Sequence, residues 1–347
     1  MSWYPVSYPC VSANQLFRPP TENTHRHAAD CPAECRLARR LCGNSRRVAV
    51  ESDIGVRFEN VGMDNELYDY SPITERAPIH WPGGARVAFY VGLNVEHYQV
   101  DRPSTSIFPG TAGLAPDPLN YGWRDYGPRV GIWRLADILD RHRVRASVLL
   151  NSDVVQHNPQ IITAGLARDW AWLAHGKNNS IFQADMTVEQ ERAYLTEVVE
   201  TIERATGRRP RGWMGPALTE TFRTPELLAE LGLDYVLDWT NDDQPYRLNV
   251  PGMLSVPYTV ELNDNTLFLA KGTSGPDFVR IVKDQLDQLY AESADSGRVM
   301  ALALHPFVIG QAFRAKYLDQ ALEYVVNHPG VWLTTTDEIA AHFAASA

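Results

Sequence analysis

RVAFYVGLNVEH (residues 86–97) and RVMALALHPF (residues 298–307) decide the fold, because each is a short apolar run that stops at polar or ionisable residues. Continuous apolar runs of roughly four to eight residues are typical of strands buried on both faces. Six further runs share this character: RASVLLN (145–151), WAWLAH (170–175), RGWMG (211–215), DYVLDW (234–239), MLSVPY (253–258) and VWLTT (331–335).

Amphipathic stretches with helical spacing separate these runs. Their alternation with the strands predicts an α/β fold, a distorted parallel (β/α) barrel of seven or eight units. A doubly wound open sheet is the competing topology, but no glycine-rich nucleotide motif follows the first strand, so neither NAD nor ATP is indicated. The expected helices are RVGIWRLADILDRH (129–142), TVEQERAYLTEVVETIERATG (187–207), TPELLAELG (224–232), GPDFVRIVKDQLDQLYAES (275–293) and RAKYLDQALEYVVNH (314–328).

Composition narrows the class of partner. The 347 residues carry a formal net charge of -10, which disfavours sequence-independent binding to nucleic acid and binding to an anionic membrane. No apolar run approaches the roughly 20 residues that span a bilayer, and the first residues lack a secretion-signal pattern. We therefore expect a cytoplasmic protein that acts on a small molecule.

The N-terminal segment differs from the rest of the chain. Residues 1–62 show no sustained period, and they contain all four cysteines, so a catalytic thiolate or a disulfide in the remainder is excluded. We expect an irregular tail, or a segment upstream of a native start at Met63, followed by one barrel domain over 63–347. A zinc clip built on Cys31 and Cys35 lacks a matching second pair.

Ionisable side chains gather where the predicted strands end. In a parallel barrel these ends meet at one mouth, where catalytic groups lie. Glu96 is the candidate base for water, and His305 the candidate acid for a leaving nitrogen, with a buried structural histidine as the alternative for His305. The strand-end groups are Glu96, His97, Asn151, His175, Asp238 and His305.

Other polar and aromatic groups near these ends have two interpretations each. Asp238 either orients His305 or another site group, or caps the loop that follows it. Trp213 and Trp239 either contact a substrate or pack in the core. For His175 and His97, the alternatives are a role in the site and a role in packing.

Taken together, these pieces resemble the polysaccharide deacetylase (NodB-homology) superfamily over residues 80–343. Its first motif, T-F-D-D, corresponds to Asn94-Val95-Glu96-His97, which places Glu96 at the base position and His97 at a metal position. The second, H-[ST]-x-x-H, corresponds to 175–179 and keeps His175 but has Asn179 in place of the second histidine. The third covers 211–216 and includes Pro216; the fourth covers 234–239, and the fifth ends at His305.

The strings DYGPRVGIWRLADILDRH, ATGRRPRGWMGPALTET, DWTNDDQPY and ALALHPFVIGQ are similar to the branch that contains allantoinase-like and cyclic-imide-hydrolase-like enzymes. The resemblance implies hydrolysis of a small amide or ureide, with His175, Asn179, Trp213, Pro216 and Trp239 near the substrate, and a homo-oligomer. It implies either no cofactor or one zinc ion on His97 and His175, and Asn179 weakens the zinc option.

Three functions therefore stand as hypotheses. The first is hydrolysis of a small cyclic or linear amide, in which Glu96 activates water, His305 protonates nitrogen, and His175 and Asn179 hold the carbonyl. The second is metal-dependent removal of the acetyl group from an N-acetyl sugar. The third is a catalytically inert, ligand-binding member of the fold.

Overall fold

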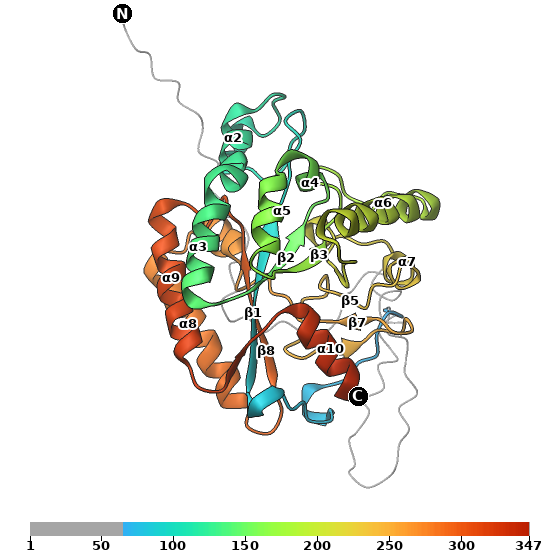
Figure 1. Ribbon diagram of the computed structural model, residues 1–347, viewed down its shortest axis with the longest axis vertical. Coiled ribbons are helices and arrows are strands. Elements are labelled where there is room, and N and C mark those ends of the chain that lie inside the picture. The colour runs from blue at the N-terminus through green and yellow to red at the C-terminus, as the bar shows by residue number, and fades with distance from the viewer. Residues whose placement is uncertain (1–64, 347) are drawn as a thin grey trace, which may run out of the picture. The chain divides into compact units, whose positions relative to one another are not determined.

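A curled, mostly parallel β-sheet forms the centre of the fold (Figure 1). The computed structural model describes residues 65–346. The sheet order is β6-β7-β5-β4-β3-β2-β1-β8, β9 pairs with β1, and only the β6–β7 pair is antiparallel. The strands are β1 (Val87–Val95), β2 (Ala146–Leu150), β3 (Ala171–Ala174), β4 (Gly212–Trp213), β5 (Tyr235–Val236), β6 (Tyr246–Arg247), β7 (Leu254–Ser255), β8 (Arg298–Leu304) and β9 (Val331–Leu333).

The two edges of the curled sheet approach each other through irregular backbone. In β8, the amide of Ala303 donates to the carbonyl of Leu262 at 3.1 Å, and the amide of Val299 donates to that of Asp243 at 2.8 Å. Residues 243 and 262 lie in segments that follow β5 and β7, on the far side of the sheet from β8. The predicted α/β class and NodB-type barrel are confirmed. The short strand β6 was not predicted.

Helices lie on both sides of the strands. In Figure 1, α3, α8 and α9 stand on one side, and α6 and α7 on the other. The five predicted helices are present, whereas α2, α4, α5 and α10 were not predicted. The helices are α2 (Pro118–Tyr126), α3 (Ile132–His142), α4 (Asp153–His157), α5 (Pro159–Leu166), α6 (Val188–Thr206), α7 (Thr224–Glu230), α8 (Gly275–Glu292), α9 (Ala312–Asn327) and α10 (Thr336–Ser346).

Local sequence signals set the ends of α6. Its N-cap Thr187 and the side chain of Gln190 form a reciprocal capping box, which satisfies two backbone amides that the first turn leaves free. Gly207 ends the helix at a φ of 71°, a conformation that favours glycine. Both ends match the predicted helix within one residue.

The packing of the core explains why β1 is a continuous apolar run and does not alternate between apolar and polar residues. All nine residues of β1 are buried. Phe89, Val91 and Leu93 belong to one hydrophobic cluster, while Ala88 and Tyr90 belong to a second, so successive side chains enter different cores. A strand covered on both faces therefore ends in polar residues only where the sheet itself ends.

Several sequence predictions concern features outside this barrel. The tail over 1–62 and its cysteines lie outside the described residues, so what the sequence analysis says of them stays a prediction.

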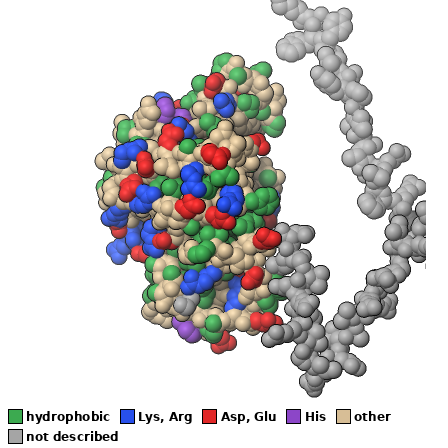
Figure 2. All heavy atoms as spheres, turned by 90° about the vertical axis from the view of Figure 1, so that its right-hand side faces the viewer, with side chains coloured by type: hydrophobic (Ala, Val, Ile, Leu, Met, Phe, Trp, Pro, Cys, Tyr) green, Lys and Arg blue, Asp and Glu red, His purple; other side chains and the backbone are tan. Residues whose placement is uncertain are grey.

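Between residues 65 and 346, no helix is long and apolar enough to cross a membrane. On the face drawn in Figure 2, Lys and Arg are interspersed with Asp and Glu.

Candidate active site

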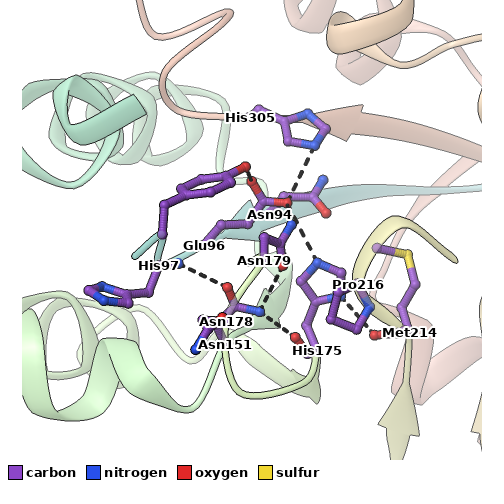
Figure 3. Close-up of polar contacts among 12 residues, drawn as sticks. Asn94, Glu96, His97, Asn151, His175, Asn178, Asn179, Met214, Pro216 and His305 are labelled. Carbon is purple, nitrogen blue, oxygen red and sulfur yellow. Dashed lines mark hydrogen bonds and ion pairs between the residues drawn. The ribbon is translucent and has the colours of Figure 1, made fainter. Parts of the chain in front are cut away.

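Three ionisable side chains converge beyond the carboxyl ends of β1, β3 and β8 (Figure 3). Glu96 Oε1 lies 3.6 Å from His175 Nε2 and 3.8 Å from His305 Nε2. All three side chains are less than a tenth exposed. The convergence expected from strand ends therefore holds for these three residues, which are about 80 to 210 positions apart in the chain.

Two hydrogen bonds orient the Glu96 carboxylate. Tyr98 donates its hydroxyl to Oε2, and Asn179 donates its side-chain N–H to Oε1. Burial by itself would raise the pKa of Glu96, but the charge of His305 and the hydrogen bond from Tyr98 act against burial, and this pKa is held below its ordinary value. Glu96 is thus ionised at neutral pH, with lone pairs left for a further donor.

Asp264 holds the His305 ring at Nδ1, whereas Nε2 of the same ring faces Glu96. Its Oδ1 lies 2.7 Å from His305 Nδ1, and its Oδ2 accepts the backbone amides of His305 and Ile309 at 2.8 and 3.1 Å. Burial alone would lower the pKa of His305, but the Asp264 and Glu96 carboxylates raise it above the ordinary histidine value. His305 therefore favours the protonated form, with Nε2–H facing Glu96.

His175 has a defined tautomer. Its Nδ1 lies 2.7 Å from the carbonyl oxygen of Met214, which only accepts, so Nδ1 carries the proton. In the neutral ring, Nε2 then presents a lone pair beside Glu96. This buried Nε2 has no hydrogen-bond partner among residues 65–346. It is suited to accept a hydrogen bond from water or from a substrate N–H.

An amide relay sets the orientation of Asn179. Asn151 donates from Nδ2 to Asn179 Oδ1 at 3.0 Å, which leaves the Asn179 nitrogen to face Glu96. Asn151 in turn accepts the backbone amide of His97 at 2.9 Å. Asn179 therefore acts on the carboxylate itself, whereas the sequence suggested that it holds a substrate carbonyl.

His97 does not join His175. Figure 3 shows its ring directed away from Glu96, and it stacks on the ring of His157 with centroids 4.2 Å apart. Burial and the neighbouring His157 lower the pKa of His97. The prediction that His97 and His175 hold one metal ion is corrected, because the backbone after β1 turns the His97 ring outwards towards α4. In the described part of the chain, no three His, Cys, Asp or Glu side chains group to bind a metal.

Asp238 follows β5, whereas His305 follows β8, and Asp238 does not orient His305. Its Oδ1 accepts the backbone amide of Gly215 at 2.7 Å. Its other neighbour is the carboxyl of Glu220, and burial together with that neighbour raises the pKa of Asp238 well above its ordinary value. Burial likewise raises the pKa of Glu220 to about 7. Of the roles expected for Asp238, orienting His305 is performed by Asp264, whereas Asp238 binds the Gly215 amide in the loop after β4.

The aromatic residues near the strand ends separate into two roles. Trp213 is wholly buried in the hydrophobic core, so the expectation that it contacts a substrate is corrected. Trp239 packs edge-on against Tyr68 and lines a cavity of about 1400 Å³ together with Asp238 and Glu220.

Pro216 packs against the turn that carries His175. A Cβ added at Gly176, whose φ is 65°, would lie 2.5 Å from Pro216 Cγ. Position 176 thus requires glycine for both its backbone conformation and the space available. Pro216 therefore supports the loop at the site.

A second, smaller cavity adjoins the ionisable cluster. It has a volume of about 200 Å³, and Glu96, Tyr98, His97, His157 and Arg124 form part of its wall. Of the three clustered ionisable residues, Glu96 alone lies on the wall of this cavity.

The sequence did not identify Asp264, Tyr98, Glu220 or Arg124. Asp264 follows no predicted strand; it reaches His305 because Asn263 pairs with Ala303 in β8. Tyr98 offered a signal, since it follows Glu96 and His97 directly. Glu220 and Arg124 lie in a loop and in an unpredicted helix, where no periodic pattern marks a site.

Comparison with known proteins agrees with this architecture. The model of the family described as polysaccharide deacetylase matches residues 123–236. A Helicobacter pylori peptidoglycan deacetylase is 25% identical over 286 residues, which cover 71% of this chain and 94% of that protein.

Solved structures share the fold. The crystal structure of the PuuE allantoinase is 28% identical, covers 80% of this chain and 99% of that one, and has a TM-score of 0.72. A polysaccharide deacetylase structure from Pseudomonas aeruginosa PAO1 is also 28% identical, covers 78% and 95% of the two chains, and has a TM-score of 0.71. The chain therefore contains a polysaccharide deacetylase (NodB) domain, whose family model matches residues 123–236.

Proposed function

We propose that this protein hydrolyses the carbon–nitrogen bond of a small, non-peptide amide or ureide. The observation that carries the proposal is the placement of the Glu96 carboxylate, whose Oε1 lies 3.6 Å from Nε2 of His175 and 3.8 Å from Nε2 of His305. Hydrolysis of an amide needs a base for water and an acid for the leaving nitrogen. Here the two groups have pKa values shifted in opposite directions, as such a division of roles requires.

The reaction proceeds in two steps. Glu96 takes a proton from water as the water oxygen bonds to the amide carbon, while His175 Nε2 accepts a hydrogen bond from the same water. The carbon–nitrogen bond of the resulting tetrahedral species then breaks, and His305 gives its Nε2 proton to the departing nitrogen. The carboxyl product leaves with the water oxygen, and a proton returns from Glu96 to His305 through solvent to restore both groups.

Two neighbours hold the reacting groups in place. Asn179 and Tyr98 fix both oxygens of Glu96, and Asp264 fixes the His305 ring and stabilises its charge. Asp238 has no role in these steps. The donor set does not fit the zinc site that the family resemblance suggests, because Asn179 replaces a histidine and His97 points elsewhere, so no step is routed through a metal.

A small substrate is supported by the size of the cavity at Glu96, about 200 Å³. The 28% identity to the PuuE allantoinase over nearly its whole length gives further support. The relatives named as deacetylases favour a second candidate, removal of the acetyl group from an N-acetyl sugar.

A substrate panel separates these candidates. Purified protein is assayed on allantoin, cyclic imides, linear ureides and N-acetylated amino sugars, with and without a chelator, alongside elemental metal analysis. The proposal predicts chelator-resistant opening of ureide or imide substrates. Chelator-sensitive deacetylation with stoichiometric metal would overturn it in favour of the sugar deacetylase, and no turnover of any amide would favour the inert alternative.

A further inference from the structure

Arg124 is an unusual residue in the cavity at Glu96. It lies in α2, it is only 3% exposed, and no carboxylate of residues 65–346 forms an ion pair with it. One guanidinium nitrogen, Nη1, donates to the carbonyl of Thr105 at 2.6 Å, whereas the buried Nε has no partner in the described chain. A buried guanidinium nitrogen without an acceptor is costly, so a further acceptor is expected.

The other charges on this cavity wall already have partners. Glu96 lies beside the protonated His305, and Asp125 lies 3.8 Å from Arg129. Burial lowers the pKa of His97, which leaves that ring neutral around pH 7. Burial also lowers the pKa of Arg124, yet a guanidinium stays charged throughout the neutral range. Arg124 is therefore a charged group on the wall of a small cavity, where the carboxylates of Asp117 and Glu96 act on it but form no ion pair with it.

Arg124 is also placed close to the reacting groups. Its guanidinium lies over the ring of Tyr98, 4.8 Å from the ring centroid, and the Tyr98 hydroxyl donates to Glu96. One aromatic ring thus separates the guanidinium from the proposed base. A group held by Arg124 would belong to the same small molecule whose amide lies at Glu96.

We propose that Arg124 binds a carboxylate of the substrate, so that the enzyme acts on small amides that carry an anionic oxygen group near the scissile bond. The planar guanidinium matches a carboxylate through two parallel hydrogen bonds, and the cavity excludes much of the water that would weaken them. This inference rests on the proposed function, since it names the substrate class of the same site.

Binding without turnover tests the inference separately from catalysis. The Glu96→Gln protein is titrated by calorimetry with succinamate, which carries a carboxylate and an amide, and with succinamide, which is neutral and of the same shape. We expect succinamate to bind at least about tenfold more tightly, because a charge-assisted pair replaces a neutral contact. Equal affinities would overturn the inference even if the protein hydrolyses neutral amides.

A second pair of variants locates the preference. In the Glu96→Gln background, Arg124→Gln is expected to abolish the preference for succinamate, and Arg129→Gln to retain it. Arg129 is the matched control because it lies near the same cavity but is mostly exposed and pairs with Asp125. A preference that survives Arg124→Gln would assign the anion to another group. The comparison of the two probes on the Glu96→Gln protein needs no change at Arg124, so it stands even if Arg124→Gln does not fold.

Discussion

Two groups of buried carboxyls lie at the same end of the barrel, and they behave in opposite ways. Glu96 is flanked by His175 and His305, and its pKa is lowered despite burial. Glu220 and Asp238 face each other, no Lys, Arg or His of residues 65–346 pairs with either, and burial raises both pKa values. Burial acts in the same direction on all three, so the cationic neighbours decide which carboxyl is ionised.

This difference assigns a task to each group. An ionised carboxylate beside a protonated imidazole is suited to take a proton from water. Two facing carboxyls whose pKa values are raised hold a proton more readily, and Asp238 Oδ1 serves as the acceptor for the Gly215 amide. The peptide unit between Met214 and Gly215 contacts both groups. Its amide, from Gly215, donates to Asp238, and its carbonyl, from Met214, accepts a hydrogen bond from His175 Nδ1.

The largest effect is expected from removing the ionised carboxylate. Glu96→Gln preserves shape but not basicity, so kcat should fall by on the order of 10³-fold while substrate binding persists. Steady-state kinetics on a substrate found in the panel, with calorimetric binding, measures both quantities. Retention of more than about a tenth of the turnover would show that another group activates water.

The next effect comes from removing the charge behind His305. Asp264→Asn should lower kcat/KM by about 10²-fold and move its alkaline limb to lower pH, because the imidazolium loses its main stabilising charge. The surface pair of His142 and Asp319, with atoms 2.8 Å apart, supplies the control Asp319→Asn, which should change neither value. An unshifted alkaline limb in Asp264→Asn would rule out His305 as the group titrating there.

A smaller effect is expected at Asn179. Asn179→Ala removes one hydrogen bond from Glu96, so kcat/KM should fall about tenfold and its acid limb should move to higher pH. Asn178→Ala serves as the control, since its side chain donates to Asp153 at 2.8 Å and does not contact Glu96. Equal losses in both variants would mean that the whole turn, and no specific bond, is required.

The smallest effect on turnover, and a distinct effect on stability, is expected at Glu220. Its pKa is raised in the folded state from the ordinary 4.5 to about 7, so the wild-type protein loses stability as pH rises through this interval. In the Glu220→Gln variant, the Gln side chain can donate a hydrogen bond to Asp238 without taking up a proton. The free energy of unfolding should therefore exceed that of the wild type by on the order of 2 kcal/mol at about pH 8, and by little at about pH 5.

Thermal melts at the two pH values check this prediction. Glu226→Gln on the same cavity wall is the control, because Glu226 pairs with Arg223 at 2.8 Å. A Glu220→Gln protein that is less stable at about pH 8 would show that the Glu220 carboxylate is ionised and paired.

The sequence predicts the barrel well because its strands are covered on both faces and its polar residues follow them. That pattern predicts that Glu96, His175 and His305 meet at one mouth of the barrel. It could not place Asp264, which enters through a bridge between residues distant in the chain, or the direction of the His97 ring, which a single turn after β1 determines. Side-chain partners in loops depend on tertiary contacts that periodicity does not encode.

The most direct test of the central claim is the protonation of His305 in the folded protein. Histidine-labelled protein is titrated by NMR from about pH 5 to about pH 9, and the His305 signal is assigned with a His305→Gln variant. We predict that His305 titrates above the ordinary histidine value of 6.5, as its contacts with Asp264 and Glu96 require. Titration below that value would mean that burial prevails over the two carboxylates, and would contradict the assignment of His305 as the acid.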